Sequence, residues 1–523
     1  MQYGDFYYPM PVNEPVLSYA PGSAEKAALK AALKELKSTK VDVPMYIGNE
    51  EIRTGKTVEL RPPHERKHLL GYFHTGEAKH VTKAINAALK AKDKWANMSW
   101  ENRANIFLKA ADLLAGKYRP YINGTTMLGQ SKNAFQAEID SACELIDFLR
   151  FNVHFLSEIY RQQPISGAGM NNRMEYRPLE GFVFALTPFN FTAIGGNLPT
   201  SAAMCGNVVV WKCANTQVYS AQMFMRILKE AGLPDGVFNV VHGDVEIVEA
   251  ICDHPDIEAV SFVGSTKVAK LVYQRGTANL KRVLALGGAK NHLIVLPDAN
   301  PAMTAQNVVA SMSGCAGQRC MAAGAMLAVG DTEAIIEKIC AEARKVIPGQ
   351  NLGAVISQEA KTRIEKYITE AESQGAKVLV DGRHAAVSGK EGGTYVGPTV
   401  IDHVQPDMAI AREEVFGPVI SIIRTNTVDE ALAIENASPY GNAAAVFTQH
   451  GGMARYIIER ASAGMIGVNV GVPVPREPFS FGGWNESKFG SGDITGKSSI
   501  GFWTRLKKST VKWNQEAGIN WMS

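Results

Sequence analysis

Short apolar runs alternate with helical segments along this chain, and this alternation limits its fold more than any other feature. In the first half the apolar runs are residues 182–186, 208–212, 237–241, 259–263 and 283–286. Short strands that alternate with helices are typical of a doubly wound, parallel α/β sheet. The pattern resumes after residue 289, so a second α/β domain is predicted. Its runs are residues 293–296, 326–329, 377–380 and 418–424.

The remaining segments are predicted to lie outside these two sheets. Residues 1–60 are expected to form an irregular arm, because four prolines occur by residue 21. Apolar residues at helical spacing predict helices at 81–95, 99–116 and 134–158. Alternating residues at 173–179 and 501–513 predict strands that belong to neither sheet.

The composition excludes several classes of function. Lys and Arg number 54 and Asp and Glu 51, so the net charge of +3 is small and argues against nucleic acid as a partner. No run of about 18 apolar residues predicts a membrane span, and no secretory signal is recognised. Seven cysteines without a CxxC pair or a zinc spacing indicate a reduced protein without a bound metal. A soluble, cytoplasmic protein is therefore expected.

A cysteine set among small residues is the first candidate for chemistry. Residues 314–322 read GCAGQRCMA, and Cys320 follows Arg319 directly. Small neighbours leave a side chain accessible, and an adjacent cation favours the thiolate that attacks carbonyl groups. A small buried hydrophobic residue is the other interpretation of a free cysteine, and this stretch alone does not decide between them.

Two polar residues stand where predicted strands end, the edge at which open α/β sheets bind ligands. Asn190, in the stretch TPFNFT, offers an amide that can stabilise a developing oxyanion. Lys212 offers a cation for ribose hydroxyls or phosphate. Each residue alone also fits a structural role, as a turn residue and as a solvated cation.

Two further stretches could bind a nucleotide. Gly264 and Ser265, in FVGST, form a small turn before a predicted helix, whose N-terminus can hold phosphate oxygens. In the stretch EEVFGP, Glu414 can bind ribose hydroxyls and Phe416 can pack on a flat ring. Neither stretch is specific by itself, because FVGST is not a GxGxxG fingerprint and EEVFGP also fits a charged turn.

Together and in this order, the five stretches resemble the NAD(P)-dependent aldehyde dehydrogenase superfamily over nearly the whole chain. The resemblance implies that Cys320 attacks an aldehyde to give a thiohemiacetal, whose oxyanion is held by the Asn190 side chain and the Cys320 N–H. Hydride would pass to the nicotinamide and leave a thioester. The dinucleotide site that the resemblance implies contains Lys212, Asn215, Gly264, Ser265, Glu414 and Phe416.

The resemblance also implies a division of the chain into three parts. A Rossmann-like dinucleotide-binding domain would comprise residues 1–162 and 182–288, and a catalytic domain residues 289–494. Residues 163–181 and 495–523 would form a small β oligomerisation flap. A homodimer or a higher homo-oligomer is therefore expected.

Two positions depart from the pattern of the superfamily. Its usual general base is a glutamate in an ELGG-type stretch, where this chain has Ala285. The acidic residue three positions after the cofactor lysine is replaced by Asn215. A carboxylate there would bind the adenosine ribose and repel a 2′-phosphate, so the choice between NAD and NADP stays open.

The two halves of the chain resemble different members of the superfamily. Residues 13–212 resemble the pyrroline-5-carboxylate (L-glutamate γ-semialdehyde) dehydrogenases, notably in QAEIDSACELIDFLRF and LEGFVFALTPFNFTAIGGN. From residue 236 onward the chain resembles the CoA-acylating methylmalonate-semialdehyde dehydrogenases, notably in CDHPDIEAVSFVGS and GVNVGVPVP. Both resemblances imply an aldehyde that carries a carboxylate.

The residues implied for substrate binding are divided in the same way. Glu138 matches a substrate-pocket glutamate of the first group, and Phe191 with Phe481 match its aromatic pair. Arg319 matches a carboxylate-binding arginine of the second group, and Ala285 matches the missing base of an enzyme that transfers its acyl group to CoA.

Oxidation of glutamate γ-semialdehyde to glutamate, a step of proline catabolism, is the function predicted first. CoA-dependent oxidation of methylmalonate semialdehyde is the alternative. An aldehyde dehydrogenase fold without catalytic activity, kept as a structural or binding protein, is the alternative of another class.

Overall fold

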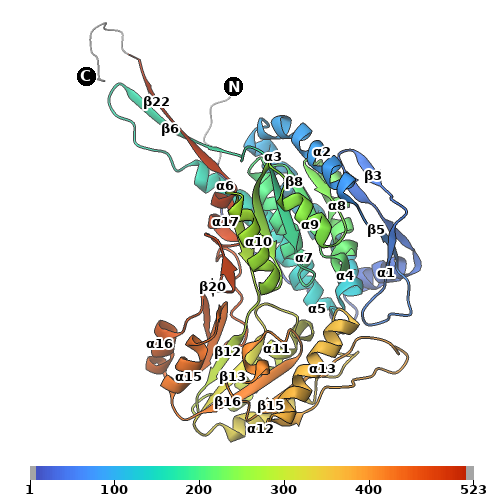
Figure 1. Ribbon diagram of the computed structural model, residues 1–523, viewed down its shortest axis with the longest axis vertical. Coiled ribbons are helices and arrows are strands. Elements are labelled where there is room, and N and C mark those ends of the chain that lie inside the picture. Colours follow the sequence, from blue (N-terminus) through green and yellow to red (C-terminus); the bar gives the residue numbers. More distant parts are fainter. Residues whose placement is uncertain (1–6, 514–523) are drawn as a thin grey trace.

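The protein, seen as a computed structural model that describes residues 7–513, consists of two α/β bodies and a projecting two-stranded ribbon (Figure 1). The first body is built on an eight-stranded sheet with the order β21-β11-β10-β7-β8-β9-β2-β3, in which the edge strand β21 spans Lys488–Phe489. Its five central strands are parallel, which confirms the fold class predicted from the alternation of strands and helices. They are β7 (Phe182–Thr187), β8 (Val209–Cys213), β9 (Phe238–Val240), β10 (Ile257–Val263) and β11 (Arg282–Leu286).

The strand order reverses at β7, which lies between β8 and β10. Successive connections therefore leave β7 toward opposite sides, and a crevice opens at the carboxyl ends of these strands. The helices that begin at this edge are α7 (Thr192–Met204), α8 (Val218–Ala231), α9 (Val245–Cys252) and α10 (Thr266–Ala278).

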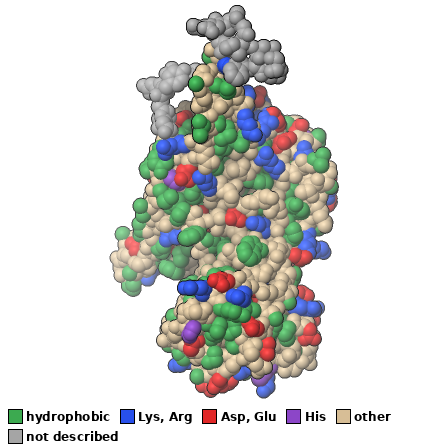
Figure 2. Space-filling view, turned by 90° about the vertical axis from the view of Figure 1, so that its left-hand side faces the viewer, with side chains coloured by type: hydrophobic (Ala, Val, Ile, Leu, Met, Phe, Trp, Pro, Cys, Tyr) green, Lys and Arg blue, Asp and Glu red, His purple; other side chains and the backbone are tan. Residues whose placement is uncertain are grey.

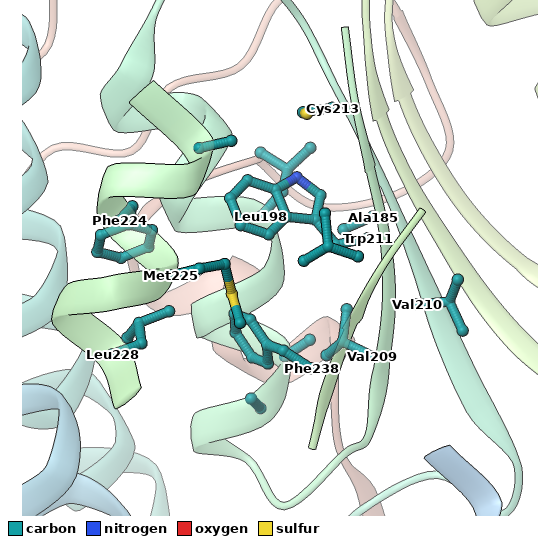
Figure 3. Packing of buried hydrophobic residues seen from close by; sticks show 14 of the residues in the cluster. Ala185, Leu198, Val209, Val210, Trp211, Cys213, Phe224, Met225, Leu228 and Phe238 are labelled. Carbon is teal, nitrogen blue, oxygen red and sulfur yellow. The ribbon is translucent and has the colours of Figure 1, made fainter. Parts of the chain in front are cut away.

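The core of the first body is centred on Trp211 of β8, which is 1% exposed. Its ring packs edge-on against Phe224 of α8 and Phe238 of β9, with centroids 6.5 and 6.3 Å apart, and Figure 3 shows these side chains pointing toward one another. The Trp211 Nε1 donates a hydrogen bond to Thr187 Oγ1 at 3.0 Å. This bond ties the carboxyl end of β7 to the core and so fixes the start of the segment that carries Asn190.

The second body contains a seven-stranded sheet with the order β14-β15-β16-β13-β12-β18-β19, in which only β14 is antiparallel to its neighbour. Its strands are β12 (Asn291–Val295), β13 (Ala323–Val329), β14 (Lys377–Val380), β15 (Thr399–Asp402), β16 (Val419–Thr425), β18 (Ala443–Phe447) and β19 (Met465–Val468). Residues 287–290 connect β11 directly to β12. The carboxyl edge of the first sheet therefore faces the amino edge of the second.

Helices cover both sides of the second sheet (Figure 1). They are α11 (Pro301–Ser313), α12 (Glu333–Ala343), α13 (Gln358–Ser373), α15 (Val428–Asn436) and α16 (Gly451–Arg460). The α11 helix begins with Pro301 after Asn300, whose side chain accepts the Met303 N–H at 3.0 Å, a normal N-cap.

The prediction of an irregular arm over residues 1–60 is wrong for most of its length, and residues 1–6 lie outside the described part. Helix α1 (Ala24–Ser38) begins after the N-cap Ser23 and buries Leu29, Ala32 and Leu36 on one face. Short strands follow it, namely β1 (Val41–Val43), β2 (Met45–Ile47), β3 (Glu50–Ile52), β4 (Thr57–Leu60) and β5 (Gly71–His74). The four early prolines all precede the N-cap Ser23, so none of them lies inside this helix.

The predicted helices are confirmed, with one interruption. Helices α2 (Ala78–Ala96) and α3 (Trp100–Ala115) match the first two, and Ser99 caps α3 as expected. The segment predicted as one helix over 134–158 is divided into α5 (Ala134–Ala137), the π-helix η1 (Glu138–Glu144) and α6 (Leu145–Tyr160). π-Helical turns are rare and are frequent at functional sites.

The projecting ribbon pairs β6 (Met170–Arg177) with β22 (Arg505–Lys512) in antiparallel register. The predicted strand at 501–513 begins only at Arg505, because residues 496–502 form the short helix α17 (Gly496–Phe502). Leu506 and Val511 are 48% and 40% exposed, and Figure 2 shows apolar side chains on this end of the molecule. The role of the ribbon in oligomerisation stays a prediction, and residues 514–523 of the predicted flap lie outside the described part.

Candidate active site

A cavity of about 1160 Å³ lies where the carboxyl edge of the first sheet meets the second body. Segments far apart in the sequence meet in its wall, and the wall includes most of the residues that the sequence singled out for cofactor binding and catalysis. These are Asn190, Lys212, Gly264, Ser265, Cys320, Glu414 and Phe416.

Cys320 is held in the cavity wall by its own backbone. Its carbonyl oxygen accepts hydrogen bonds from Asn291 Nδ2 at 2.7 Å and Asn442 Nδ2 at 2.9 Å. Three residues earlier, Gly317 has a φ of +70°, and a Cβ there would lie 2.0 Å from the Gly417 carbonyl oxygen. Only glycine permits this approach, which joins the cysteine loop to the loop that carries Phe416. The sequence reasoning missed these two asparagines, because neither stands in one of the five stretches.

The Cys320 thiol is protonated at neutral pH in this site. Burial raises its pKa to about 12, and the charges of Glu414 and Glu144 add to this effect. Arg319 acts in the opposite direction but is outweighed. The expected effect of Arg319 on the Cys320 thiol is thus present but smaller than the effect of burial, so the side chain needs a proton acceptor before it can attack.

Asn190 lies beside Cys320 and is 9% exposed. Its Nδ2 donates to the Gln318 carbonyl oxygen at 3.1 Å, which fixes the amide and uses one of its two N–H groups. The Asn190 carbonyl oxygen accepts from Lys132 Nζ at 2.6 Å. The second N–H of the amide is thus available to an oxyanion formed at Cys320.

The turn after β10 and the end of β8 form one side of the cavity. Gly264 and Ser265 precede α10, and Lys212 stands near the end of β8 with a pKa that burial lowers, against an opposing effect of Asp244. Asn215 Nδ2 donates to Asp244 Oδ1 at 3.0 Å. Asp244 lines the cavity, so a carboxylate is present close to the position where Asn215 replaces the family acid.

Glu414 and Phe416 lie on the opposite side of the cavity. Burial raises the pKa of Glu414 to about 7, although the Ala289 N–H donates to its Oε1 at 3.0 Å. Phe416 has a left-handed backbone, with φ of 53°, and its ring stands edge-on to Phe189 with centroids 5.9 Å apart. Such strained conformations are concentrated at ligand-binding sites.

Glu138, expected in the substrate pocket, is placed elsewhere by the structure. It is 0% exposed and does not belong to the wall of the cavity. Its carboxylate accepts from the Arg119 guanidinium, from Tyr19 Oη at 2.8 Å and from the Leu17 N–H at 2.9 Å. The side chain thus fastens the N-terminal segment to the helices of the first body.

Of the other three residues expected to bind substrate, Phe481 and Arg319 lie close to Cys320. Phe481 packs in one apolar cluster with Cys320 and Val472, while the Phe191 ring is covered by Lys132 Nζ at 4.0 Å. Arg319 precedes Cys320, and its Nη2 donates to the carbonyl oxygens of Ala310 and Ser311 at 2.8 and 2.9 Å. The Arg319 Nε is buried and has no hydrogen-bond partner among residues 7–513.

The position of the usual general base carries no acid. Ala285 is buried within β11 and is 0% exposed. Glu144, the last residue of η1, was not singled out by the sequence reasoning, yet its charge acts on the Cys320 thiol. The residues around it read as one apolar helix, so the sequence contained no signal of its effect on Cys320.

A model of the aldehyde dehydrogenase family matches residues 51–509 of the chain. The chain belongs to this family. This aldehyde dehydrogenase is 39% identical to the Delta-1-pyrroline-5-carboxylate dehydrogenase of Agaricus bisporus, over 98% of this chain and 97% of that protein. It is 37% identical to malonate-semialdehyde dehydrogenase 2 of Geobacillus kaustophilus, over 90% of this chain and 98% of that protein.

A solved structure extends the likeness of this aldehyde dehydrogenase to three dimensions. The crystal structure of the Delta-pyrroline-5-carboxylate dehydrogenase from Mycobacterium tuberculosis bound with NAD matches with a TM-score of 0.90 and 31% identity, covering 100% of this chain and 99% of that one. The cavity fits such a cofactor, because its wall combines the Lys212 cation, the turn at Gly264 and Ser265 before α10, and the Glu414 carboxyl, whereas Asn215 does not belong to this wall.

Two negative findings concern the described part of this aldehyde dehydrogenase. No group of three or more His, Cys, Asp or Glu side chains within residues 7–513 is arranged to hold a metal ion. No helix in this part is both long and apolar enough to span a membrane.

Proposed function

We propose that this aldehyde dehydrogenase oxidises L-glutamate γ-semialdehyde, the open form of pyrroline-5-carboxylate, to glutamate with NAD as the oxidant. The observation that carries the proposal is the cavity in which Cys320 and Asn190 meet the predicted dinucleotide-binding residues Lys212 and Glu414. The relatives named pyrroline-5-carboxylate dehydrogenase, which match over nearly the whole chain, support this substrate.

The residues of the cavity would act in sequence. Lys212, Gly264, Ser265, Glu414 and Phe416 would hold NAD, which supplies a hydride acceptor when bound. Cys320 loses its proton and attacks the aldehyde carbon, and the Asn190 amide donates to the oxyanion of the thiohemiacetal. After oxidation the acyl group is a thioester of Cys320, and its hydrolysis releases glutamate.

The test of this function is NADH formation from pyrroline-5-carboxylate by the purified protein, with and without CoA. We expect turnover without CoA, with glutamate as the product. If NADH appears only when CoA is present, the hydrolytic function is wrong.

One observation favours a second function, the CoA-dependent oxidation of a semialdehyde. The position of the usual general base is occupied by Ala285, which is buried and cannot accept a proton. An enzyme that transfers its acyl group to CoA has no need of a base to activate water. The likeness to a malonate-semialdehyde dehydrogenase agrees with this alternative. Malonate semialdehyde and methylmalonate semialdehyde, each with CoA, are therefore the substrates to assay next, and release of the acyl-CoA would establish it.

The preference for NAD over NADP is expected to depend on Asp244. Asn215 holds the Asp244 carboxylate beside Lys212, where its charge would repel a 2′-phosphate and accept a ribose hydroxyl. We expect D244S to reduce the ratio of the NADP to the NAD dissociation constant by about tenfold, which corresponds to about 1.4 kcal/mol. Quenching of tryptophan fluorescence by each dinucleotide measures both constants.

The matched control for this experiment is E246S. Glu246 is exposed, lies two residues after Asp244 and does not belong to the cavity wall. Its replacement should leave both dissociation constants unchanged. An unaltered preference in D244S would show that another group selects the cofactor.

The oligomeric state is proposed from the ribbon of β6 and β22. A homodimer would cover the exposed Leu506 and Val511 of this ribbon, since apolar side chains on a projecting element are typical of an interface.

A further inference from the structure

The loop between β19 and β20 (Trp484–Asn485) lies against the nucleophile. Val472 and Phe481 of this loop pack with Cys320 against one small cluster of buried apolar side chains. These two side chains are therefore neighbours of any aldehyde that bonds to Cys320. Their positions depend on how the loop between them is held.

Both ends of the loop are anchored by hydrogen bonds. At the first end, Ser311 Oγ of α11 donates to the Gly471 carbonyl oxygen at 2.7 Å, and the Gly471 N–H donates to Asn307 Oδ1 at 3.2 Å. At the second end, the Phe481 N–H donates to Thr495 Oγ1 at 2.8 Å. These bonds fix where the loop begins and ends, but they do not fix the shape of its middle part.

The middle of the loop, residues 472–479, is held from the first body instead. Among residues 7–513, every hydrogen bond that it makes outside the loop goes to Asp147 or to the N-terminal segment. The Nη2 and Nε of Arg476 donate to Asp147 Oδ2 at 3.1 and 3.3 Å. The same Nη2 donates to the Glu14 carbonyl oxygen at 2.8 Å. Arg476 therefore makes most of the contacts that fix the middle of the loop.

Asp147 joins this loop to the N-terminal segment. It is 0% exposed within α6, and its carboxylate accepts the Glu14 N–H at 2.6 Å and Asn13 Nδ2 at 3.0 Å in addition to Arg476. Asn13 Nδ2 also donates to the Glu477 carbonyl oxygen at 3.2 Å. A buried carboxylate needs such partners, and here they come from opposite ends of the chain.

The side chain of Glu14 fixes the N-terminal segment in turn. It is 11% exposed, and its Oε1 and Oε2 accept from Arg119 Nη1 at 2.6 Å and Arg150 Nη1 at 2.7 Å. Arg119 belongs to α4 (Arg119–Gln130) and Arg150 to α6. Because both helices belong to the first body, the backbone of Glu14 is a fixed support for the guanidinium of Arg476.

We propose that Arg476 is a positioning residue for the oxidation of the aldehyde. Its bonds to Asp147 and Glu14 hold the loop in the shape that places the two apolar side chains beside the nucleophile. This inference rests on the role of Cys320 in the proposed function and applies to either semialdehyde. Without these bonds the middle of the loop populates other shapes, and the aldehyde binds productively only to the ordered fraction.

The test is R476M, which replaces the guanidinium by an uncharged side chain. If about one tenth of the molecules keep the ordered loop, KM for the aldehyde rises about tenfold. Because bound substrate orders the loop again, kcat should change by less than about twofold. The dissociation constant of NAD, measured by tryptophan fluorescence, should stay unchanged. R476K keeps a charge that can reach Asp147 and should give an intermediate KM.

A second variant, D147N, separates positioning from direct binding of the substrate. D147N removes the charge that holds Arg476, so KM should rise as it does in R476M. In the double variant R476M/D147N, KM should lie within about twofold of the larger single effect, because both changes break one contact. If Arg476 instead bound the substrate carboxylate, D147N would free it. An unchanged or lower KM in D147N would therefore overturn the assignment.

The matched control is R53M. Arg53 has a side chain that is 45% exposed and pairs with Asp42 at 2.7 Å, whereas that of Arg476 is 48% exposed. It follows β3 and does not belong to the cavity wall, so R53M should leave KM and kcat unchanged. A wild-type KM in R476M, or a lower kcat at an unchanged KM, contradicts the positioning role. A wild type that oxidises neither semialdehyde counts against the proposed function instead.

Discussion

The C320S variant is expected to lose NADH formation by a factor on the order of 10³ or more, whichever semialdehyde is the substrate. Cys320 and Cys252 both belong to the wall of the cavity, but Cys252 is only 2% exposed, at the end of α9, on the side of the predicted dinucleotide site. A serine hydroxyl is a far weaker nucleophile than a thiolate, and no described histidine lies in the cavity wall to activate it. Initial rates of NADH formation measure the loss.

The control for this variant is C315S. Cys315 belongs to the same loop and is also partly exposed, but it does not belong to the cavity wall. It should keep most of the activity, and both variants should bind NAD as the wild type does. An active C320S would remove Cys320 from its role as the nucleophile. If C320S and C315S are equally inactive, both substitutions disturb the loop, and the loss of activity is not evidence that Cys320 is the nucleophile.

The E138Q variant is expected to lower the free energy of unfolding by about 3–5 kcal/mol, the range seen when one partner of a buried ion pair is removed. Glu138 is 0% exposed, and the Arg119 side chain paired with it is 7% exposed. Without the carboxylate, the Arg119 charge stays buried and, among residues 7–513, retains only Glu14 as an ionic partner. Denaturant unfolding followed by circular dichroism measures the loss.

The pH dependence of this contribution has a definite sign. Burial raises the pKa of Glu138, but hydrogen bonds from Arg119, Leu17 and Tyr19 outweigh it and hold the pKa below the ordinary value. The stabilisation is therefore fully present above the ordinary carboxyl range and is lost as pH falls through the lowered pKa.

The control for E138Q is E35Q. Glu35 is exposed and accepts the Tyr121 hydroxyl at 2.9 Å, a surface contact whose loss should cost at most about 1 kcal/mol. If E138Q raises KM for pyrroline-5-carboxylate while the free energy of unfolding is unchanged, Glu138 binds substrate, as its sequence context suggests. A large loss of stability with an unchanged KM supports the structural role that its contacts indicate.

The N-terminal segment and the loop before β20 meet at Asp147. The Arg476 guanidinium pairs with Asp147 at 3.1 Å and donates to the Glu14 carbonyl oxygen at 2.8 Å. Arg476 therefore holds this loop against the first body. Val472 and Phe481, which pack by Cys320, belong to the same loop.

The sequence alone was sufficient to predict both α/β sheets and the aldehyde dehydrogenase family. Strand and helix periodicity is local, so the central strands of the first sheet could be read within one or two residues of their observed ends. The five motifs have fixed local sequences, and the structure brings Asn190, Lys212, Gly264, Glu414 and Cys320 into one cavity. For Asn190, Lys212 and Gly264 this follows from the sheet order, because the carboxyl ends of parallel strands share one edge. Cys320 and Glu414 precede strands of the second sheet, whose amino edge faces that edge.

Only the tertiary structure distinguished Glu138 from Glu144, which are six residues apart in one predicted helix. The π-helical turn between them and the packing of remote segments decide that the first pairs with Arg119 and that the second acts on Cys320. The same holds for the Cys320 thiol: its neighbour Arg319 suggested a thiolate, but burial and two distant carboxylates raise the pKa to about 12. The burial of a side chain and the electrostatic effect of its surroundings depend on atoms from distant parts of the chain. A local pattern of residues therefore cannot predict either of them.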